Sequence, residues 1–210
     1  MENKINIIRK SEYKMSEWSG GTTTELLIYP YETKYIDRNF KWRLSSAKVE
    51  VEESEFTYLS GFSRIIMILE GNLTLKHQDH YEKILTPFQQ DSFMGHWHTK
   101  SYGKATDFNL MLSKDCEGKL EPLSLKRQET YNMVFDEYES FKNSDKFKKL
   151  TYIFYNLSGD LNIKIGGKSF ALRSKELMDV TMVTNAGKPN IEFYNGSEKE
   201  TRIIKAVILY

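Results

Sequence analysis

A charged side chain on the core-facing side of a strand is the first candidate for chemistry. From Trp42 to Val51, polar and apolar residues alternate with period two, which predicts a β-strand. Lys48 and Glu50 share one parity and must face water. The opposite parity therefore faces the core, and it consists of Arg43, Ser45, Ala47, Val49 and Val51. A buried guanidinium needs an anion, because an unpaired buried ion costs on the order of several kcal/mol.

Three further segments place polar groups where they could meet Arg43. Glu25 lies on a Thr-rich strand that follows a Gly-Gly turn and ends at Pro30, and it is either a partner for an inward arginine or a solvated residue. Arg64 precedes the apolar run 65–69, at the start of an expected central strand where a barrel would open. Asp107 and Asn109 share one face of the expected strand 107–112.

These side chains predict a polar patch inside an apolar barrel. The candidate ligand-binding residues are Arg43, Arg64, Ser45, Asp107, Asn109 and Glu25. Such a patch would suit a small ligand with one or two carboxylates, since arginine pairs with carboxylate bidentately and amide and hydroxyl groups add orientation. The alternative is that an arginine pairs with Asp107 or Glu25 inside the protein and nothing binds.

Two histidines are the main candidates for a metal site. His96 and His98 would point the same way on a strand, but no third ligand is evident, and His77 and His80 are expected in a surface turn. No P-loop, dinucleotide fingerprint or nucleophile elbow is present. Cys116, the one cysteine, cannot form an intramolecular disulfide. We therefore expect no metal, no other cofactor and no catalytic residue.

Composition limits the partners. The chain has 210 residues and a net charge of +1. It therefore lacks the excess of basic residues that would favour binding to nucleic acid or to an anionic membrane. Its longest apolar runs fall far short of the ~20 residues that a membrane span needs. These features predict a cytoplasmic protein, and the 13% aromatic content favours β structure.

An internal repeat predicts two copies of one β-unit. Residues 64–85 and 152–172 share the order strand, glycine break, strand, turn, strand, with Gly71 and Gly159 at equivalent positions. Short strands with frequent turn signals favour a sandwich or barrel in each copy. We expect a first module at 1–113 with the pocket, a partly helical connecting segment at 114–150, and a smaller module at 151–210.

The order of several short motifs resembles the HutD/Ves family. The resemblance covers residues 5–113 well and the second half only through the repeat. The motifs are Trp18…Gly20-Gly21…Thr24-Glu25, Trp42-Arg43-Leu44-Ser45, Gly61-Phe62-Ser63-Arg64, Leu69-Glu70-Gly71, Phe93-Met94-Gly95 and Asp107-Phe108-Asn109-Leu110-Met111.

The resemblance implies a fold and a function. It implies an all-β bicupin, with two RmlC-like jelly-roll barrels in one chain. Family members are associated with bacterial histidine utilisation, and are thought to bind a small acidic metabolite of the formylglutamate type and to regulate the pathway. The family's two arginines match Arg43 and Arg64, which would line the pocket.

Two departures keep other functions open. The family's Phe-x-Gly-Asp segment ends in His96 here, and the usual cupin metal pattern is absent from both halves. The sequence favours a binding protein over an enzyme. The enzyme alternative is a metal-dependent cupin that acts on a small acid through His96 and His98, and a third possibility is an interaction module with structural ion pairs. Exposed edge strands also allow a homodimer.

Overall fold

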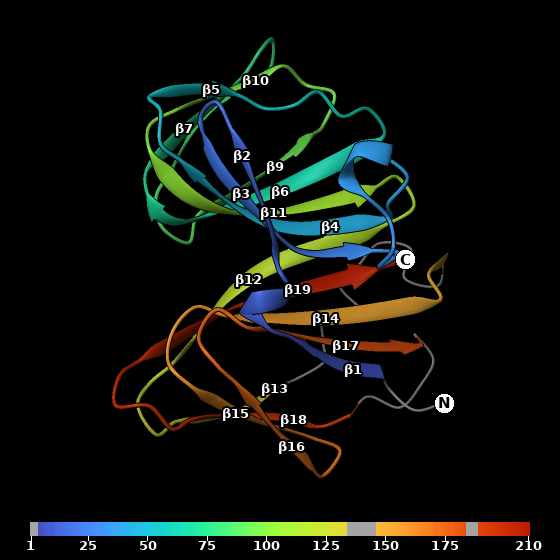
Figure 1. The fold of residues 1–210 in the computed structure, drawn as a ribbon, viewed down its shortest axis with the longest axis vertical. Helices are drawn as coiled ribbons and strands as arrows, with labels where there is room; N and C mark the ends of the chain where they lie inside the picture. Colours follow the sequence, from blue (N-terminus) through green and yellow to red (C-terminus); the bar gives the residue numbers. More distant parts are fainter. Residues whose placement is uncertain (1–3, 134–145, 184–188) are drawn as a thin grey trace. The chain divides into compact units, whose positions relative to one another are not determined.

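The computed structural model describes residues 4–133, 146–183 and 189–210 (Figure 1). Apart from two 3₁₀ turns, Lys10–Glu12 and Tyr35–Asp37, the described residues form β-strands and loops. They divide into two compact units. The first module is Tyr13–Cys116, and the second module combines Met1–Glu12 with Glu117–Tyr210. None of the described helices has the length and apolar character needed to cross a membrane.

The first module is a sandwich of two antiparallel sheets. Its six-stranded sheet has the order β2 (Lys14–Trp18), β3 (Gly21–Tyr29), β4 (Trp42–Val49), β11 (Ala105–Ser113), β6 (Phe62–Gly71) and β9 (Gln90–Met94). Its four-stranded sheet has the order β5 (Glu53–Glu55), β10 (Thr99–Tyr102), β7 (Leu73–His77) and β8 (Glu82–Leu85). Buried residues from both sheets, among them Ile66, Leu75 and Phe93, form the core between them.

The second module repeats this architecture. One sheet has the order β1 (Lys4–Ile8), β17 (Leu177–Val183), β14 (Lys149–Asn156), β19 (Thr201–Leu209) and β12 (Glu117–Leu125). The other has the order β13 (Thr130–Met133), β18 (Ile191–Asn195), β15 (Leu161–Ile165) and β16 (Lys168–Leu172). Fully buried aromatic rings of Tyr152, Phe154 and Phe193 dominate its core.

The structure confirms the internal repeat. Strands β6, β7 and β8 of the first module correspond to β14, β15 and β16 of the second. The two anchor glycines have similar backbone angles, with φ of 78° at Gly71 and 68° at Gly159. Residues with a Cβ rarely adopt this left-handed conformation, so the same turn requires glycine in both modules.

The module boundaries differ from the ranges 1–113, 114–150 and 151–210. Strand β1 pairs with β17, and β12 pairs with β19, so both belong to the second module. The segment 114–150 supplies the strands β12 and β13 and the start of β14, and the expected helical part falls mainly on residues 134–145, outside the described residues. An outer strand joins whichever sheet edge offers a partner, and this edge need not belong to the nearest segment in sequence.

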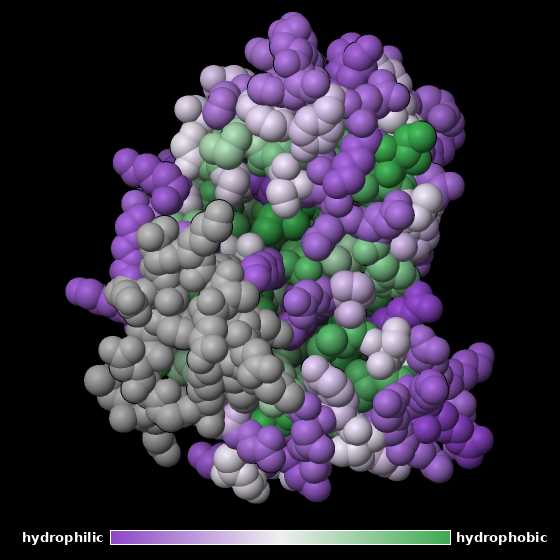
Figure 2. Space-filling model, turned by 180° about the vertical axis from the view of Figure 1, so that it is seen from behind, coloured by the Kyte–Doolittle hydropathy of each residue, from purple (hydrophilic) through white to green (hydrophobic). Residues whose placement is uncertain are grey.

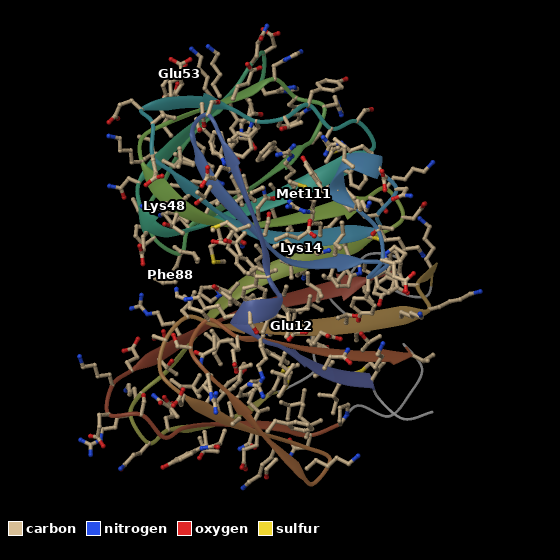
Figure 3. All side chains as sticks on the ribbon, in the orientation of Figure 1. Glu12, Lys14, Lys48, Glu53, Phe88 and Met111 are labelled. Carbon is tan, nitrogen blue, oxygen red and sulfur yellow. The ribbon has the colours of Figure 1, made fainter. Side chains whose placement is uncertain are left out.

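The inward orientation of Arg43 and Ser45 on β4 is confirmed, but the opposite parity is exposed to solvent only at Lys48, because Trp42 and Leu44 are fully buried. The Arg43 residue is 5% exposed and Ser45 is 2% exposed, whereas Lys48 is on the solvent side and pairs with Glu50. Figure 3 labels Lys48 at the outside of the first module and Met111 among its central strands. Hydrophilic side chains cover much of the face drawn in Figure 2.

Candidate functional site

A pocket of about 280 Å³ lies inside the first module. Its walls come from β2, β3, β4, β11 and β6, from the loop that carries Tyr35, and from residues 54–57. Pockets for drug-sized ligands span roughly 300–1,000 Å³. The space is therefore suited to a small metabolite.

The register of three strands brings the predicted residues together. Met111 of β11 pairs with Arg43 on β4 and with Arg64 on β6, so the two arginines flank one residue. Two residues further along the same face, Asn109 pairs with Ser45. Another two residues along, Asp107 pairs with Ala47 and completes a ladder of polar groups on one face of the sheet.

Arg43 has its charge balanced inside the protein. Its Nε donates to Oε2 of Glu25 at 2.7 Å, and its Nη1 donates to Oγ of Ser45 at 3.1 Å. The guanidinium carbon lies 4.3 Å from the centre of the Tyr35 ring, which adds a cation–π contact. The interpretation that an inward arginine pairs with Glu25 is thus confirmed for Arg43.

Arg64 is less completely satisfied. The residue is 3% exposed, its Nη2 donates to the carbonyl oxygen of Thr57, and its guanidinium lies 5.5 Å from the centre of the Phe56 ring. Its buried Nε has no hydrogen-bond partner, and no carboxylate of the described residues forms an ion pair with it. Burial lowers the pKa of Arg64, and the positive charges of Arg38 and Arg43 act in the same direction, whereas Tyr35 and Asp107 oppose the shift. Such a group would gain from an added anion.

Asp107 and Asn109 contribute further polar atoms that could accept a hydrogen bond from a ligand or donate one to it. Oδ1 of Asp107 accepts a hydrogen bond from the backbone nitrogen of Ala47 at 3.1 Å. Burial raises the pKa of Asp107 to about 7, although Ala47 and the arginines oppose that shift. The buried Oδ1 of Asn109 has no hydrogen-bond partner among the described residues. The pocket therefore presents an unpaired donor, an unpaired acceptor and a carboxyl group that titrates near neutrality.

Five of the six predicted residues line this pocket: Arg43, Ser45, Arg64, Asp107 and Asn109. Glu25 does not line it, but reaches Arg43 from β3 and holds it in place. The sequence missed the ring of Tyr35, the carbonyl of Thr57 and the indole of Trp18, which also border the pocket. Tyr35 begins a short 3₁₀ turn and Thr57 lies in a loop, so no strand pattern could have identified them.

His96 and His98 do not lie on a strand as the metal interpretation required. Both are exposed in the turn between β9 and β10, and Nδ1 of His98 is 3.9 Å from Oε1 of Glu55. Within residues 4–133, 146–183 and 189–210, no group of three or more His, Cys, Asp and Glu side chains is placed to hold a metal ion. The alternation argument for these two residues was wrong, because the chain turns at Gly95 and His96.

His77 is buried, contrary to the expected surface turn. It is 2% exposed at the end of β7, with Nδ1 at 2.8 Å from Oγ1 of Thr99 and Nε2 at 3.0 Å from Oδ2 of Asp91. Asp91 also accepts hydrogen bonds from Lys83 and Tyr81. Although burial opposes the shift, hydrogen bonds from Lys83 and His77 lower the pKa of Asp91. The network satisfies its buried groups and lies outside the pocket lining, so its role is structural.

The second module has different groups at the positions equivalent to the pocket. Matching Gly71 to Gly159 makes Tyr152 the counterpart of Arg64, and that residue belongs to the apolar core. The cross-strand neighbours at the level of Ser45 and Asn109 are Glu121 and Lys205, which form an ion pair of 2.6 Å. The polar ladder that characterises the first module is thus replaced.

Comparisons with known proteins agree with this architecture. A conserved protein of unknown function from Pseudomonas aeruginosa is 19% identical and covers 98% of both chains with a TM-score of 0.75. HutD from Pseudomonas fluorescens is 20% identical and covers 97% of this chain and 98% of its own, with a TM-score of 0.64. Oxalate decarboxylase from Lactobacillus farciminis, at 7% identity, covers 96% of this chain and 85% of its own with a TM-score of 0.64.

These matches and the paired jelly-roll modules identify the fold as a bicupin. At such identities they establish the fold alone. The family is established by the sequence: the HutD family model matches residues 10–191, which is most of the chain. The chain therefore belongs to the HutD family.

Proposed function

We propose that the protein binds a small carboxylate-bearing metabolite of the formylglutamate type and has a regulatory role in histidine utilisation. The observation that carries the proposal is the buried guanidinium of Arg64, which lines a pocket of metabolite size and whose Nε has no hydrogen-bond partner among the described residues. A ligand carboxylate would supply the missing acceptor. The pathway follows from the association of the HutD family with histidine utilisation, and the size and polarity of the pocket support the chemical class.

The different partners of the two arginines support Arg64 alone as the residue that binds the anion. Arg43 already has Glu25 as its counter-ion, so it shapes the pocket, whereas Arg64 has charge available. Asn109 offers an acceptor for a donor group on the ligand, such as the N–H of an acylated amino acid. HutD from Pseudomonas fluorescens is described in a formate condition, and the Lactobacillus farciminis enzyme as a formate complex, so formate belongs among the test ligands.

A thermal-shift titration tests the proposal. Purified protein is titrated with N-formylglutamate, glutamate, formate and urocanate, in parallel with Arg64→Met and a matched control, Lys48→Met. Lys48 loses the same charge, but from the solvent side of β4. An acid at about 100 times its Kd should stabilise the wild type and the control by roughly 2.7 kcal/mol and leave Arg64→Met unchanged. Equal shifts in all three proteins, or none with any acid, would contradict the proposal.

A further inference from the structure

Of the two carboxyl groups that line the pocket with both arginines among the described residues, Asp107 is buried and Glu55 is exposed. Asp107 is 2% exposed, and its Oδ1 is held by the backbone of Ala47. Its other oxygen accepts no hydrogen bond from the residues that the structure describes, although the residue lines the pocket. A ligand carboxylate bound at Arg64 would therefore meet a second carboxyl group.

The charges around this carboxyl group can be counted. The groups facing the pocket or its walls are Arg43 on β4, Arg64 on β6, Glu25 on β3, Tyr35 and Arg38 from the loop between β3 and β4, and Glu55 on β5. Glu25 neutralises Arg43, and the Glu55 side chain is 59% exposed. Arg38 lies 3.9 Å from the centre of the Tyr35 ring and does not line the pocket, although its buried Nη1 has no hydrogen-bond partner among the described residues. Among the described side chains that line the pocket, Arg64 is thus the one cation without a counter-ion, and it is shared by two possible anions, Asp107 and the ligand.

We propose that Asp107 carries a proton whenever the pocket holds a carboxylate, so that its free oxygen donates a hydrogen bond to the ligand and each ligand is taken up with one proton from solvent. The inference rests on the proposed function. Two carboxylates that share one buried site cannot both ionise without a second cation. Protonation turns a repulsive group into a donor, which a ligand with two acceptor oxygens can use together with Arg64.

The sign of the pH dependence follows from this count. Burial raises the pKa of Asp107 to about 7, so the empty pocket carries the proton at pH 6 and has lost it at pH 8.5. The acids themselves are fully ionised over that range. Affinity should therefore be constant below about pH 6 and should fall about tenfold for each pH unit above 7, because binding then requires one proton.

Isothermal titration calorimetry with N-formylglutamate, repeated with formate, provides the test. Titrations at pH 8 in phosphate and in Tris, buffers with different ionisation enthalpies, report the number of protons taken up on binding. We expect close to one proton at pH 8, close to none at pH 6, and an affinity about 30-fold weaker at pH 8.5 than at pH 6. Asp107→Asn keeps a donor that does not titrate, so it should bind with the same affinity at both pH values and take up no proton.

The outcomes separate this inference from the proposed function. Binding by the wild type with constant affinity from pH 6 to 8.5 and no proton uptake would overturn the inference and leave the ligand class intact. Proton uptake that persists in Asp107→Asn would assign the proton to another group, such as Glu25, and would also overturn it. Absence of binding by every acid at pH 6 would overturn both. If Asp107→Asn fails to fold, Glu25→Gln takes its place: proton uptake should persist in that variant, and its loss would assign the proton to Glu25 and overturn the inference.

Discussion

Arg43 and Glu25 form an ion pair of 2.7 Å between neighbouring strands, whereas Arg64, two strands away on the same sheet, has no carboxylate partner among the described residues. Both guanidiniums are almost fully buried and flank Met111. The same residue type therefore has two different roles in one pocket. In the proposed function, Arg43 belongs to the framework of the pocket, and Arg64 is the group that pairs with the ligand.

Removing Glu25 should destabilise the protein through Arg43. Glu25→Gln leaves a buried cation without its counter-ion, and we expect the free energy of unfolding to fall by about 2–3 kcal/mol. Glu50→Gln, which removes the exposed partner of Lys48 just after the end of β4, should have no measurable effect. Urea denaturation at pH 7 measures both variants, and equal stability of the two would mean that the Arg43–Glu25 pair contributes nothing to folding.

Replacing Arg64 should have the opposite effect on stability. Arg64→Met removes a buried charge that no carboxylate compensates, so stability in the absence of ligand should be unchanged or higher. Arg43→Met, by contrast, leaves Glu25 without its counter-ion and should be destabilising. Denaturation curves of the two variants, recorded without ligand, compare these cases directly. A marked loss of stability in Arg64→Met alone would assign Arg64 to the framework.

Asp107 should make the folded protein less stable as pH rises. Its folded-state pKa, about 7, lies above the unfolded value of 3.8, so the native state binds more protons between these values and the free energy of unfolding decreases there. Between pH 5.5 and pH 8 the decrease from this group amounts to about 2 kcal/mol. Subtracting the profile of Asp107→Asn from that of the wild type isolates the contribution, and a difference that stays flat over this range would refute it.

The repeat glycine at the end of β6 should tolerate no side chain. At Gly71, φ is 78° and an added Cβ would lie 2.4 Å from the carbonyl oxygen of Lys104. Gly166 also has a positive φ, of 55°, but an added Cβ meets nothing within 4 Å. Gly166→Ala should therefore cost roughly 1–2 kcal/mol from the backbone conformation alone, and Gly71→Ala at least twice as much. Similar melting temperatures for the two alanine variants would show that the close contact is relieved cheaply.

Strand parity was sufficient to predict the polar ladder. Lys48 and Glu50 require water, and this fixes the orientation of Arg43 and Ser45 on the same strand, as the structure confirms. The position of Arg64 before an apolar run likewise predicted a strand that begins beside a cavity. The first prediction succeeds because it depends on a period of two within one strand, and the second because it depends on a local change from polar to apolar residues.

The features that the sequence did not predict depend on the arrangement of distant segments. The edge strand β1 joins β17, more than 160 residues away, and no local pattern encodes that choice. Tyr35 contacts Arg43 from the 3₁₀ turn between β3 and β4. His77 was expected in a turn because it precedes Gln78 and Asp79, but its ring is hydrogen-bonded to Asp91 and Thr99 on two other strands.

The most direct measurement of the central claim is the Nε–H signal of Arg64 in ¹H–¹⁵N NMR spectra of the folded protein. Arg64→Lys identifies the signal by its disappearance, and the Nε–H of Arg43, already bonded to Glu25, serves as the internal reference. Titration with N-formylglutamate or formate should move the Arg64 signal downfield to saturation, since its unpaired Nε gains an acceptor, and should leave the Arg43 signal in place. An Arg64 signal that stays unchanged at saturating concentrations of both acids would contradict the account.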